Sequence, residues 1–374
     1  MQNFISGTHI NQGHYKSFQP TYINRQWVID NMDLILLMSE ADRQLGRLDM
    51  YSEHIPDVNL FIGMHVYKEA IESNKIEGTK TSIEEALLDA ENISHEKKDD
   101  WEEVGNYIQA MHQAIERLEK LSLSSRLIRE THKTLLQGVR GERKLPGEFR
   151  TSQNWIGGAS INDATFIPPI HYTINDLMND LEKFAHNDSL SVSHLLKIAI
   201  IHYQFETIHP FLDGNGRIGR LLITLYLVEK GLLKKPILYL SDFFERNKSL
   251  YYDNLMKART ENNITQWIKF FLVGIVETAI KGTKTFDAIL KLKHNTDIKV
   301  QTLGSRSTNA QKIMLYLFKN PTLSVNKVNR ITDTSKRTAY NLIADLEKLE
   351  ILKEITGAKR NKLYVFDNYL KLFK

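Results

Sequence analysis

One stretch of twelve residues, His209 to Arg220 with the sequence HPFLDGNGRIGR, constrains this chain more than any other. Apolar residues recur at helical spacing before it, in 193–207, and after it, in 221–228. A polar stretch between two such segments is predicted to form a loop between two buried helices. The same loop should become the N-terminus of the second helix.

The residue types in this stretch suit the binding of an anion beside a base. The Gly-Asn-Gly loop at 214–216 can turn its N–H groups toward an anion, helped by the positive end of the helix dipole. Arg217 and Arg220 share a helix face and can fork onto phosphate oxygens. Asp213 offers a hard ligand for Mg²⁺, and His209, expected to titrate near neutrality, can take a proton from a hydroxyl. We therefore predict a nucleotide-phosphate site; a helix cap with surface charges is the alternative.

The stretch resembles the Fic family motif, His-x-Phe-x-(Asp/Glu)-Gly-Asn-Gly-Arg-x-x-Arg, at every fixed position. The resemblance implies protein adenylylation, the transfer of AMP from ATP to a Ser, Thr or Tyr hydroxyl of a protein. It implies that His209 is the general base, that Asp213 holds Mg²⁺ and that Phe211 anchors the loop in the core. It also implies that Arg217 contacts the β-phosphate and Arg220 the γ-phosphate. The residues expected to bind ATP are Gly214, Asn215, Gly216, Arg217, Ile218, Gly219 and Arg220, with Asn247 and Tyr252 near the adenine.

A second segment, Ser73-Asn-Lys-Ile-Glu77-Gly78, resembles the inhibitory motif of the same family, (Ser/Thr)-x-x-x-Glu-(Gly/Asn). Taken alone, Glu77 would be a solvated acid at the end of a helix. The resemblance implies that Glu77 pairs with Arg220 and withholds it from the γ-phosphate. Such competition is physically sound, because a carboxylate and a phosphate both accept the forked donors of a guanidinium. Ser73 and Glu77 precede the catalytic stretch, so inhibition from within the same chain is expected.

Composition favours an ordinary soluble protein, with 42% hydrophobic and 25% charged residues. The chain has no cysteine, which excludes disulfides and thiolate metal sites and fits a reducing compartment. The first residues lack a signal-peptide pattern, and no apolar run approaches the roughly 20 residues needed to cross a bilayer. We therefore expect a cytoplasmic protein with no membrane partner.

The segment 146–170 differs in character from the helical segments around it. Gly, Pro, Asn and Asp are dense there, and the apolar residues are aromatic or β-branched, which favours a hairpin over a helix. A surface connector is the alternative. In the family that the chain resembles, a β-hairpin flap at this place aligns the hydroxyl-bearing segment of the target by strand addition. The elements Gly147-x-x-Arg150 and Ile156-Gly-Gly158 look like that region.

The C-terminal part of the chain carries a separate signal. Residues 301–374 hold 14 Lys and Arg against 6 Asp and Glu, although the whole chain has a net charge of only +4. Three helical patterns followed by two apolar runs around a basic turn give the order of a winged helix-turn-helix. Side chains expected to read bases are Ser335, Lys336, Arg337 and Tyr340, and those expected to reach phosphates are Lys359, Arg360 and Lys362. A winged helix used for protein contacts is the alternative.

The expected fold is mainly α: a Fic-type helical bundle with a β-hairpin flap, plus a C-terminal winged helix-turn-helix domain. Residues 1–25 are interpreted as an extended arm lying on the main domain. The expected domains are an N-terminal helical region with the inhibitory motif (1–110), the Fic catalytic core (111–285), a linker (286–308) and the winged helix (309–374).

The resulting hypothesis is a protein adenylyltransferase restrained by Glu77, with ATP and a protein hydroxyl as partners. Self-modification, a homodimer and a DNA partner for 309–374 are left open. One alternative is another Fic-type transfer of a nucleotide or phosphate group, or removal of AMP with Glu77 positioning the water. A second is a DNA-binding regulator in which the phosphate site only senses nucleotide. A third is an adaptor that does not bind DNA and uses the winged helix as a partner surface.

Overall fold

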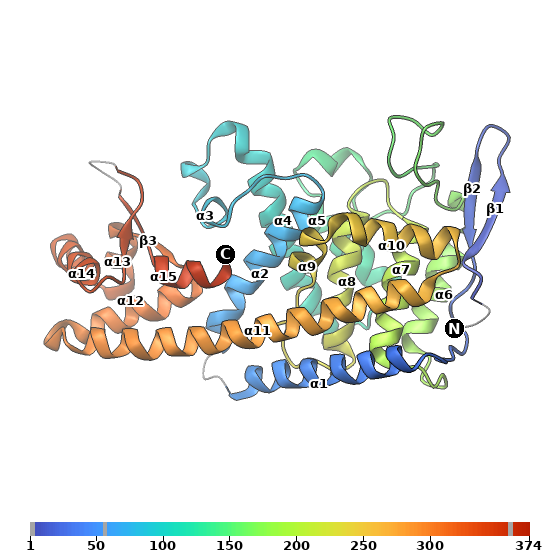
Figure 1. Ribbon diagram of the computed structural model, residues 1–374. Helices are drawn as coiled ribbons and strands as arrows, with labels where there is room; N and C mark the ends of the chain where they lie inside the picture. Colours follow the sequence, from blue (N-terminus) through green and yellow to red (C-terminus); the bar gives the residue numbers. More distant parts are fainter. Residues whose placement is uncertain (1–3, 55–57, 358–361) are drawn as a thin grey trace.

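The computed structural model describes residues 4–54, 58–357 and 362–374. Of the residues predicted to contact phosphates, Lys359 and Arg360 lie outside the described residues. The structure is mainly helical, as predicted, with short strands only at the two ends of the chain (Figure 1). No helix within the described part of the chain combines the length and apolar character needed to cross a bilayer.

Two buried helices at the centre carry the catalytic stretch between them. These are α7 (His194–Ile208) and α8 (Asn215–Glu229), which pack against each other. Every residue of α7 from Leu195 onward is buried, so this helix has no solvent face. The helices around the pair are α2 (Val58–Ile76), α4 (Lys98–Leu118), α5 (Ser125–Leu135), α6 (Ile174–His186) and α10 (Lys248–Thr260), with the short α3 (Ile83–Ala86) and α9 (Ser241–Arg246) between them.

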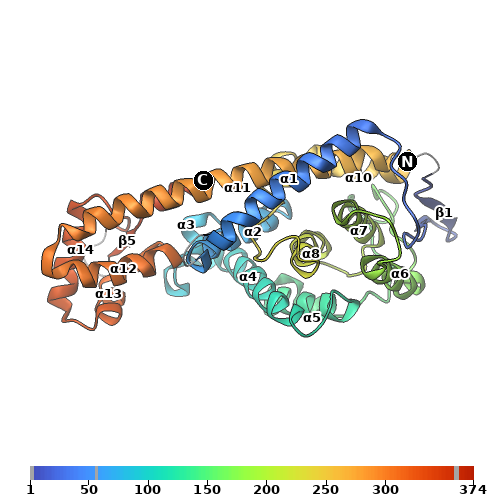
Figure 2. The same cartoon turned by 90° about the horizontal axis from the view of Figure 1, so that it is seen from below.

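A long helix, α11 (Ile264–Gln301), runs beside α1 (Met32–His54) and continues toward the C-terminal unit (Figures 1 and 2). The linker predicted at 286–308 is therefore wrong for most of its length, because α11 passes through it without a break. The reason is a helical apolar pattern hidden among polar residues. Phe286, Ile289, Thr296 and Val300 are buried on one face of α11.

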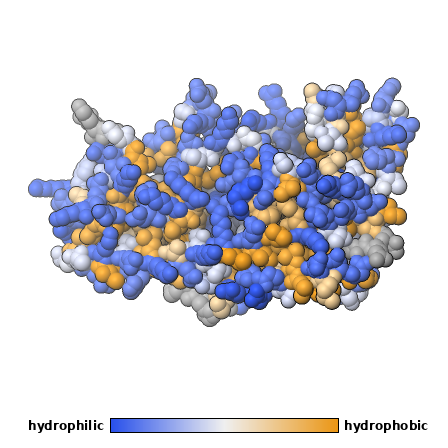
Figure 3. All heavy atoms as spheres, in the orientation of Figure 1, coloured by the Kyte–Doolittle hydropathy of each residue, from blue (hydrophilic) through white to orange (hydrophobic). Residues whose placement is uncertain are grey.

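The surface of α1 and α11 also carries apolar side chains. Figure 3 shows hydrophobic residues gathered over this face, between hydrophilic ones. The exposed large hydrophobic residues on the two helices include Met32, Leu36 and Val273. Apolar residues at helical spacing therefore do not all mark the core here.

The N-terminal arm is extended, but it pairs with itself, which the sequence analysis did not predict. Strands β1 (Gly7–Asn11) and β2 (Lys16–Pro20) form an antiparallel hairpin in which His9 lies opposite Phe18. The N–H of Phe18 donates to the carbonyl of Ile167 at 2.9 Å, so the arm reaches the 146–170 segment. Phe18 and Phe166 also lie with ring centroids 5.6 Å apart.

The 146–170 segment contains one antiparallel bridge, Ile156 to Phe166, where a longer hairpin was predicted. Gly157 and Gly158 both have positive φ, at 70° and 72°, and turn the chain immediately after the bridge. Pro168 and Pro169 cannot donate to a ladder on the returning side. Pairing is therefore confined to a single position. We call 150–169 the flap segment below.

The C-terminal unit contains the three helices and the two following strands expected from the sequence, together with a strand and a last helix that were not expected. It consists of α12 (Ser307–Lys319), β3 (Thr322–Ser324), α13 (Val325–Thr332), α14 (Lys336–Lys348), β4 (Lys353–Glu354), β5 (Leu363–Val365) and α15 (Asp367–Leu370), followed by a 3-10 turn (Lys371–Phe373). The strand order is β3-β5-β4, antiparallel throughout. The unit packs on α2: a Cβ placed on Gly63 would lie 3.5 Å from the carbonyl of Lys319, and the rings of His65 and Phe373 lie 5.0 Å apart.

Candidate active site

The stretch between α7 and α8, which we call the catalytic turn (His209 to Gly214), is a tight reversal held from inside. His209 ends α7 in the left-handed conformation, with φ 49° and ψ 60°. Phe211 is buried and stacks on the ring of His132 at 3.7 Å. The side chain of Asn215 accepts from the N–H of Phe211 at 2.8 Å and donates to its carbonyl at 2.9 Å. The turn is thus held by His132 of α5 and by Asn215, the first residue of α8.

The first turn of α8 forms an anion cradle. Gly214 adopts φ 74° and precedes the helix, so the amides that follow have no partner within it. Glu77 reaches this cradle from the C-terminal end of α2. A Cβ on Gly216 would lie 2.4 Å from the Glu77 Oε1, which shows that the carboxylate rests directly on the glycine.

Arg220 is fully engaged by two residues of the Ser73-to-Gly78 segment. Its Nη2 donates to the Glu77 Oε1 at 2.7 Å and to the carbonyl of Ser73 at 2.8 Å, while its Nε donates to the Ser73 Oγ at 2.9 Å. The charge of Arg220, opposed by burial, lowers the pKa of Glu77 below its usual value, and Glu77 raises the pKa of Arg220. Both groups are therefore ionised at neutral pH, and they form an ion pair in which Arg220 is buried and Glu77 is partly exposed.

Arg217 is also paired with a carboxylate, which sequence reasoning missed. Its Nη1 lies 3.1 Å from the Glu103 Oε2 of α4 and donates to the Asn74 Oδ1 at 3.3 Å. The side chains of Arg217 and Glu103 are both buried. A signal for Glu103 existed in the sequence: it falls on the buried face of α4 with Tyr107 and Ala110, where an acid requires a partner.

His209 lies at the junction between the cradle and the flap segment. Burial, followed by the positive charges of Arg259 and Arg150, lowers the pKa of His209 to about 3. This pKa lies below the near-neutral value expected from the residue type, because the side chain is half-buried near two guanidinium groups. Its Nδ1 has no hydrogen-bond partner among the described residues. At neutral pH the imidazole is an uncharged base able to accept a proton.

Asp213 lies at the mouth of the cradle. Its side chain is 43% exposed, and its Oδ1 accepts from the N–H of Gly214 at 2.6 Å and lies 3.6 Å from Arg217. Within the described ranges, no group of three or more His, Asp or Glu side chains gathers as a metal site. A single accessible carboxylate nevertheless fits Mg²⁺, which is commonly held by one or two carboxylates together with substrate phosphates.

The other predicted nucleotide contacts divide into two groups. Tyr252 is 39% exposed, and Glu77, Arg220 and Glu206 all act on the pKa of its hydroxyl, so it lies beside the arginine end of the cradle. Asn247 instead donates its side-chain amide to the carbonyl of Phe243, the helix turn before it.

Two residues of the motif itself face the interior. Ile218 is buried, and a Cβ on Gly219 would lie 2.2 Å from the Glu206 Oε1. Glu206 is the second acid that sequence reasoning missed; burial raises its pKa to about 7, and its Oε1 has no partner among the described residues. Its position one helix turn before His209, inside an otherwise apolar helix, was the available signal.

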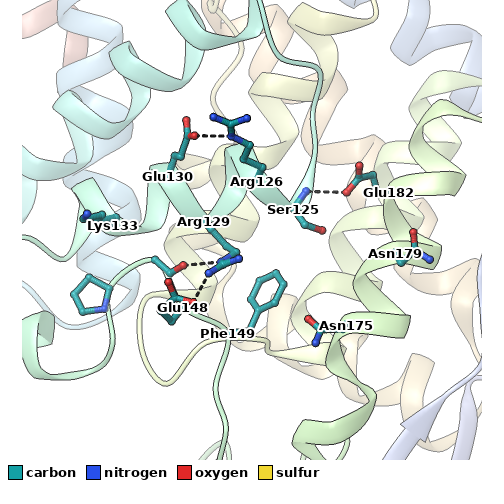
Figure 4. Close-up of a pocket in the computed structure, with 12 residues that line it drawn as sticks. Ser125, Arg126, Arg129, Glu130, Lys133, Glu148, Phe149, Asn175, Asn179 and Glu182 are labelled. Atoms are coloured by element: carbon teal, nitrogen blue, oxygen red, sulfur yellow. Dashed lines mark hydrogen bonds and ion pairs between the residues drawn. The ribbon is translucent and has the colours of Figure 1, made fainter.

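A separate cavity lies between α5, residues 146–149 and α6 (Figure 4). Its volume is about 470 Å³, and its charged walls are mostly satisfied internally: Arg129 pairs with Glu148, and Arg126 with Glu130. The cavity touches the catalytic turn only indirectly, through Phe149, whose ring lies 5.2 Å from that of Phe211. The residues of the motif therefore lie outside this cavity.

Two stretches of the chain match families of known proteins. Residues 35–116 match the family described as Fic/DOC family N-terminal, and residues 122–227 match the Fic/DOC family. The first stretch contains Ser73 and Glu77, and the second contains the catalytic turn and the cradle.

Curated relatives match over part of the chain. Protein adenylyltransferase Fic of Drosophila erecta is 29% identical over 154 residues, which are 41% of this chain and 28% of that protein. A probable protein adenylyltransferase of Aquifex aeolicus (strain VF5) is 30% identical over 163 residues, which are 42% of this chain and 47% of that protein. The chain thus spans less than half of the length of these curated relatives.

Solved structures share the fold over more of the chain. A Fic family protein from Desulfovibrio desulfuricans G20 superposes with a TM-score of 0.57 at 19% identity, covering 91% of this chain and 98% of that one. A Fic domain containing signaling protein from Bacteroides thetaiotaomicron VPI-5482 gives a TM-score of 0.54 at 19% identity, covering 68% of this chain and 97% of that one. At this identity the likeness establishes a common fold.

Proposed function

The chain belongs to the Fic/DOC family, and we propose that it is a protein adenylyltransferase that moves AMP from ATP to a Ser, Thr or Tyr hydroxyl of a protein. The observation that carries the proposal is a histidine, His209, on the turn directly before an anion cradle with two arginines. Such a site can bind a triphosphate and deprotonate a nearby hydroxyl. Relatives named protein adenylyltransferase match over about two fifths of the chain.

The proposed reaction uses the residues of the catalytic turn and the cradle. The target hydroxyl gives its proton to His209 while its oxygen bonds to the α-phosphorus of ATP. The bond from that phosphorus to the bridging oxygen of the β-phosphate breaks, and pyrophosphate leaves with the electron pair. Arg217 and Arg220 meet the charge of the leaving group once phosphate has replaced their carboxylate partners. Mg²⁺ held by Asp213 would add positive charge at the phosphate oxygens.

The same proposal includes restraint by Glu77. Its carboxylate rests on Gly216 and takes the donor of Arg220 that a γ-phosphate would need. A phosphate oxygen and a carboxylate oxygen cannot both occupy that place, because each excludes the other sterically and by charge. ATP should therefore bind weakly, or in a pose unsuited to transfer, until Glu77 moves.

The first experiment uses ATP labelled at the α-phosphate, with ATP labelled at the γ-phosphate in parallel. Three forms are compared: wild type, Glu77→Gly, and Glu77→Gly with His209→Ala. The expected result is weak α-label transfer to protein in wild type, strong transfer in Glu77→Gly and none in the double variant. Transfer of γ-label would instead indicate a phosphotransferase, and strong transfer in the double variant would remove His209 as the base.

If no label moves in any form, removal of AMP becomes the next reaction to test. A protein carrying α-labelled AMP would be incubated with wild type and with Glu77→Gln. Release of AMP that needs the Glu77 carboxylate would assign that residue to positioning a water, and would replace the restraint proposed above.

We also propose that the C-terminal unit binds DNA, on the basis of one observation. Lys336, Arg337 and Tyr340 are exposed on the first turns of α14, and Ser335 caps that helix. This is where a recognition helix presents side chains to the major groove. Anisotropy titration of duplex DNA at two salt concentrations should show weaker binding and a smaller salt slope for Lys336→Ala with Arg337→Ala. Binding that matches a Lys291→Ala control on α11 would rule out this face.

A further inference from the structure

Two arginines on the flap side of the catalytic turn are buried without a carboxylate partner. Arg150 is 2% exposed and Arg259 is 6% exposed. Among the described residues, neither forms an ion pair with an acid. An unpaired buried cation is costly, so its polar contacts must recover most of the lost hydration.

Those contacts converge on the end of α7. Arg150 donates from its Nε to the carbonyl of His209 at 3.0 Å and from its Nη2 to the carbonyl of Ile208 at 3.4 Å. Arg259 donates from its Nη2 to the carbonyl of Glu206 at 2.9 Å. The last carbonyls of a helix lack partners within it and carry the negative end of its dipole. Here two guanidinium groups cap them and fix the backbone of the left-handed histidine.

The same two groups also hold the flap segment. Arg150 donates from Nη1 to the carbonyl of Ser152 at 3.0 Å and from Nη2 to that of Pro169 at 2.5 Å, which are the two ends of the segment. The guanidinium of Arg259 lies 4.2 Å from the ring centroid of Phe166, at the bridge of the segment. Arg150 therefore links the two ends of the flap segment to the backbone of His209, and Arg259 links Phe166 of the flap segment to the last turn of α7.

We propose that Arg150 and Arg259 are positioning residues that join the flap segment to the catalytic turn, so that the base and the surface that aligns the target move as one unit. This inference rests on the proposed adenylyl transfer. Neither residue needs to touch ATP or the target. Their effect on the reaction is exerted through the backbone of His209 and through the ends of the flap segment.

Their charges give the arrangement a second effect that can be measured. Besides burial and a hydrogen bond to the backbone of Glu206, the charged groups that act on the His209 imidazole are Arg259 from α10, Arg150 from the flap segment and Glu77 from the end of α2. The two arginines oppose protonation of the imidazole, while Glu77 favours it. Loss of either arginine should therefore raise the pKa of His209 toward its ordinary value of about 6.5.

The test compares four variants in the Glu77→Gly protein: Arg150→Met, Arg150→Lys, Arg259→Met, and Arg126→Met as the control. Arg126 is an exposed arginine of α5 that contacts neither the turn nor the flap segment. Three quantities are measured: kcat and KM for ATP in α-label transfer, the His209 pKa by NMR of histidine-labelled protein, and the Tm. His209→Asn assigns the NMR signal.

Arg150→Met and Arg259→Met should lower kcat by about 10-fold or more with little change in KM for ATP, since misplacement by 1 Å can cost on the order of 100-fold. The His209 pKa should rise in both. Arg150→Lys should keep the low pKa and still lose kcat, because an ammonium group cannot span four carbonyls. The control should change neither quantity.

The inference is overturned if folded Arg150→Met and Arg259→Met proteins match the control in kcat and in the His209 pKa. It is also overturned if Arg150→Lys restores full kcat, since charge alone would then suffice. Failure of the proposed function has a different signature: no transfer by the parent. In that case the NMR titration, which needs no turnover, still decides whether the arginines control His209.

Discussion

Four buried arginines surround the catalytic turn, and the two on the cradle side differ from the two on the flap side. On the cradle side, Arg217 meets Glu103 at 3.1 Å and Arg220 meets Glu77 at 2.7 Å. On the flap side, Arg150 and Arg259 meet only carbonyl oxygens, a hydroxyl, a thioether and an aromatic face among the described residues. The side that should bind phosphate is already charge-neutral, and the side that should bind protein is not.

The difference indicates which contacts can be exchanged. A carboxylate on an arginine can be replaced by a phosphate with little change in local charge, so the cradle pairs suit a site that alternates between two occupants. A guanidinium that donates to backbone carbonyls has no carboxylate that a phosphate could replace. Its contacts therefore stay the same when a ligand binds. The arginines of the cradle can therefore exchange their partners, and those of the flap side keep theirs.

The largest expected effect is a difference in folding stability between a variant on the cradle side and a variant on the flap side. Arg217→Met leaves the buried Glu103 with only Arg140 as an ionic partner, whereas Arg150→Met leaves carbonyls and no charge. Breaking a buried pair costs about 3–5 kcal/mol, and loss of hydrogen bonds to carbonyls costs about 1–3 kcal/mol. Urea denaturation at pH 7.5 should rank Arg217→Met as the less stable variant. The reverse order would contradict the distinction between exchangeable and fixed pairs.

An intermediate effect on folding stability is expected when the pH is lowered, through His202, which lies between the cradle side and the flap side. His202 is fully buried, and burial, with the charges of Arg220 and Arg259, lowers its pKa to about 3. The unfolded chain, with a histidine pKa of about 6.5, binds the proton more readily between these values. Stability is therefore complete above pH 6.5 and falls by about 1.4 kcal/mol per pH unit below it.

Urea denaturation at pH 7.5 and pH 5 measures this loss. The variant His202→Asn should show a slope with pH that is smaller by about one proton. An unchanged slope would show that His202 is already protonated in the folded protein, and that the two sides do not share their charge with it.

The smallest expected effect is a change in ATP affinity, and it concerns the cradle side alone. Glu103→Gln, made in the Glu77→Gly protein, removes a carboxylate that competes with phosphate for Arg217. Calorimetric titration should show ATP binding that is tighter by about 3- to 10-fold, in line with one charged hydrogen bond. Glu102→Gln, a neighbour on the same helix paired with Lys98, serves as the control. Weaker binding would mean that Glu103 orients Arg217 for the nucleotide and does not compete with it.

Local patterns predicted much of the fold because their causes are local. The apolar periodicity of 193–207 and 221–228 was sufficient for α7 and α8, and glycine at 214 was sufficient for the turn that starts the cradle. The order of elements after residue 306 followed in the same way. The predicted linker failed where buried residues were spaced widely among polar ones, as in the second half of α11.

The site was predictable only within its motif. The Glu77–Arg220 pair was reached through family resemblance. The position of Glu103 on the apolar face of α4 indicated a buried acid, but its partner Arg217 lies 114 positions away and could not be identified from the sequence. The low pKa of His209 has the same origin, since Arg150 and Arg259 approach it from distant parts of the chain. The pKa of a side chain depends on its environment in the assembled fold, so the residue type alone did not predict the low pKa of His209.

The helix α2 connects the C-terminal unit to the cradle. Near its start, Gly63 and His65 touch the C-terminal unit, and at its other end Ser73 and the Glu77 that follows hold Arg220. Nineteen helical residues span about 28 Å, a length over which a helix transmits a tilt or a shift with little bending. Thermodynamic linkage then works in both directions. A ligand that shifts the C-terminal unit on α2 changes the affinity of the cradle for ATP, and ATP that expels Glu77 changes the affinity of that unit for its ligand by the same factor.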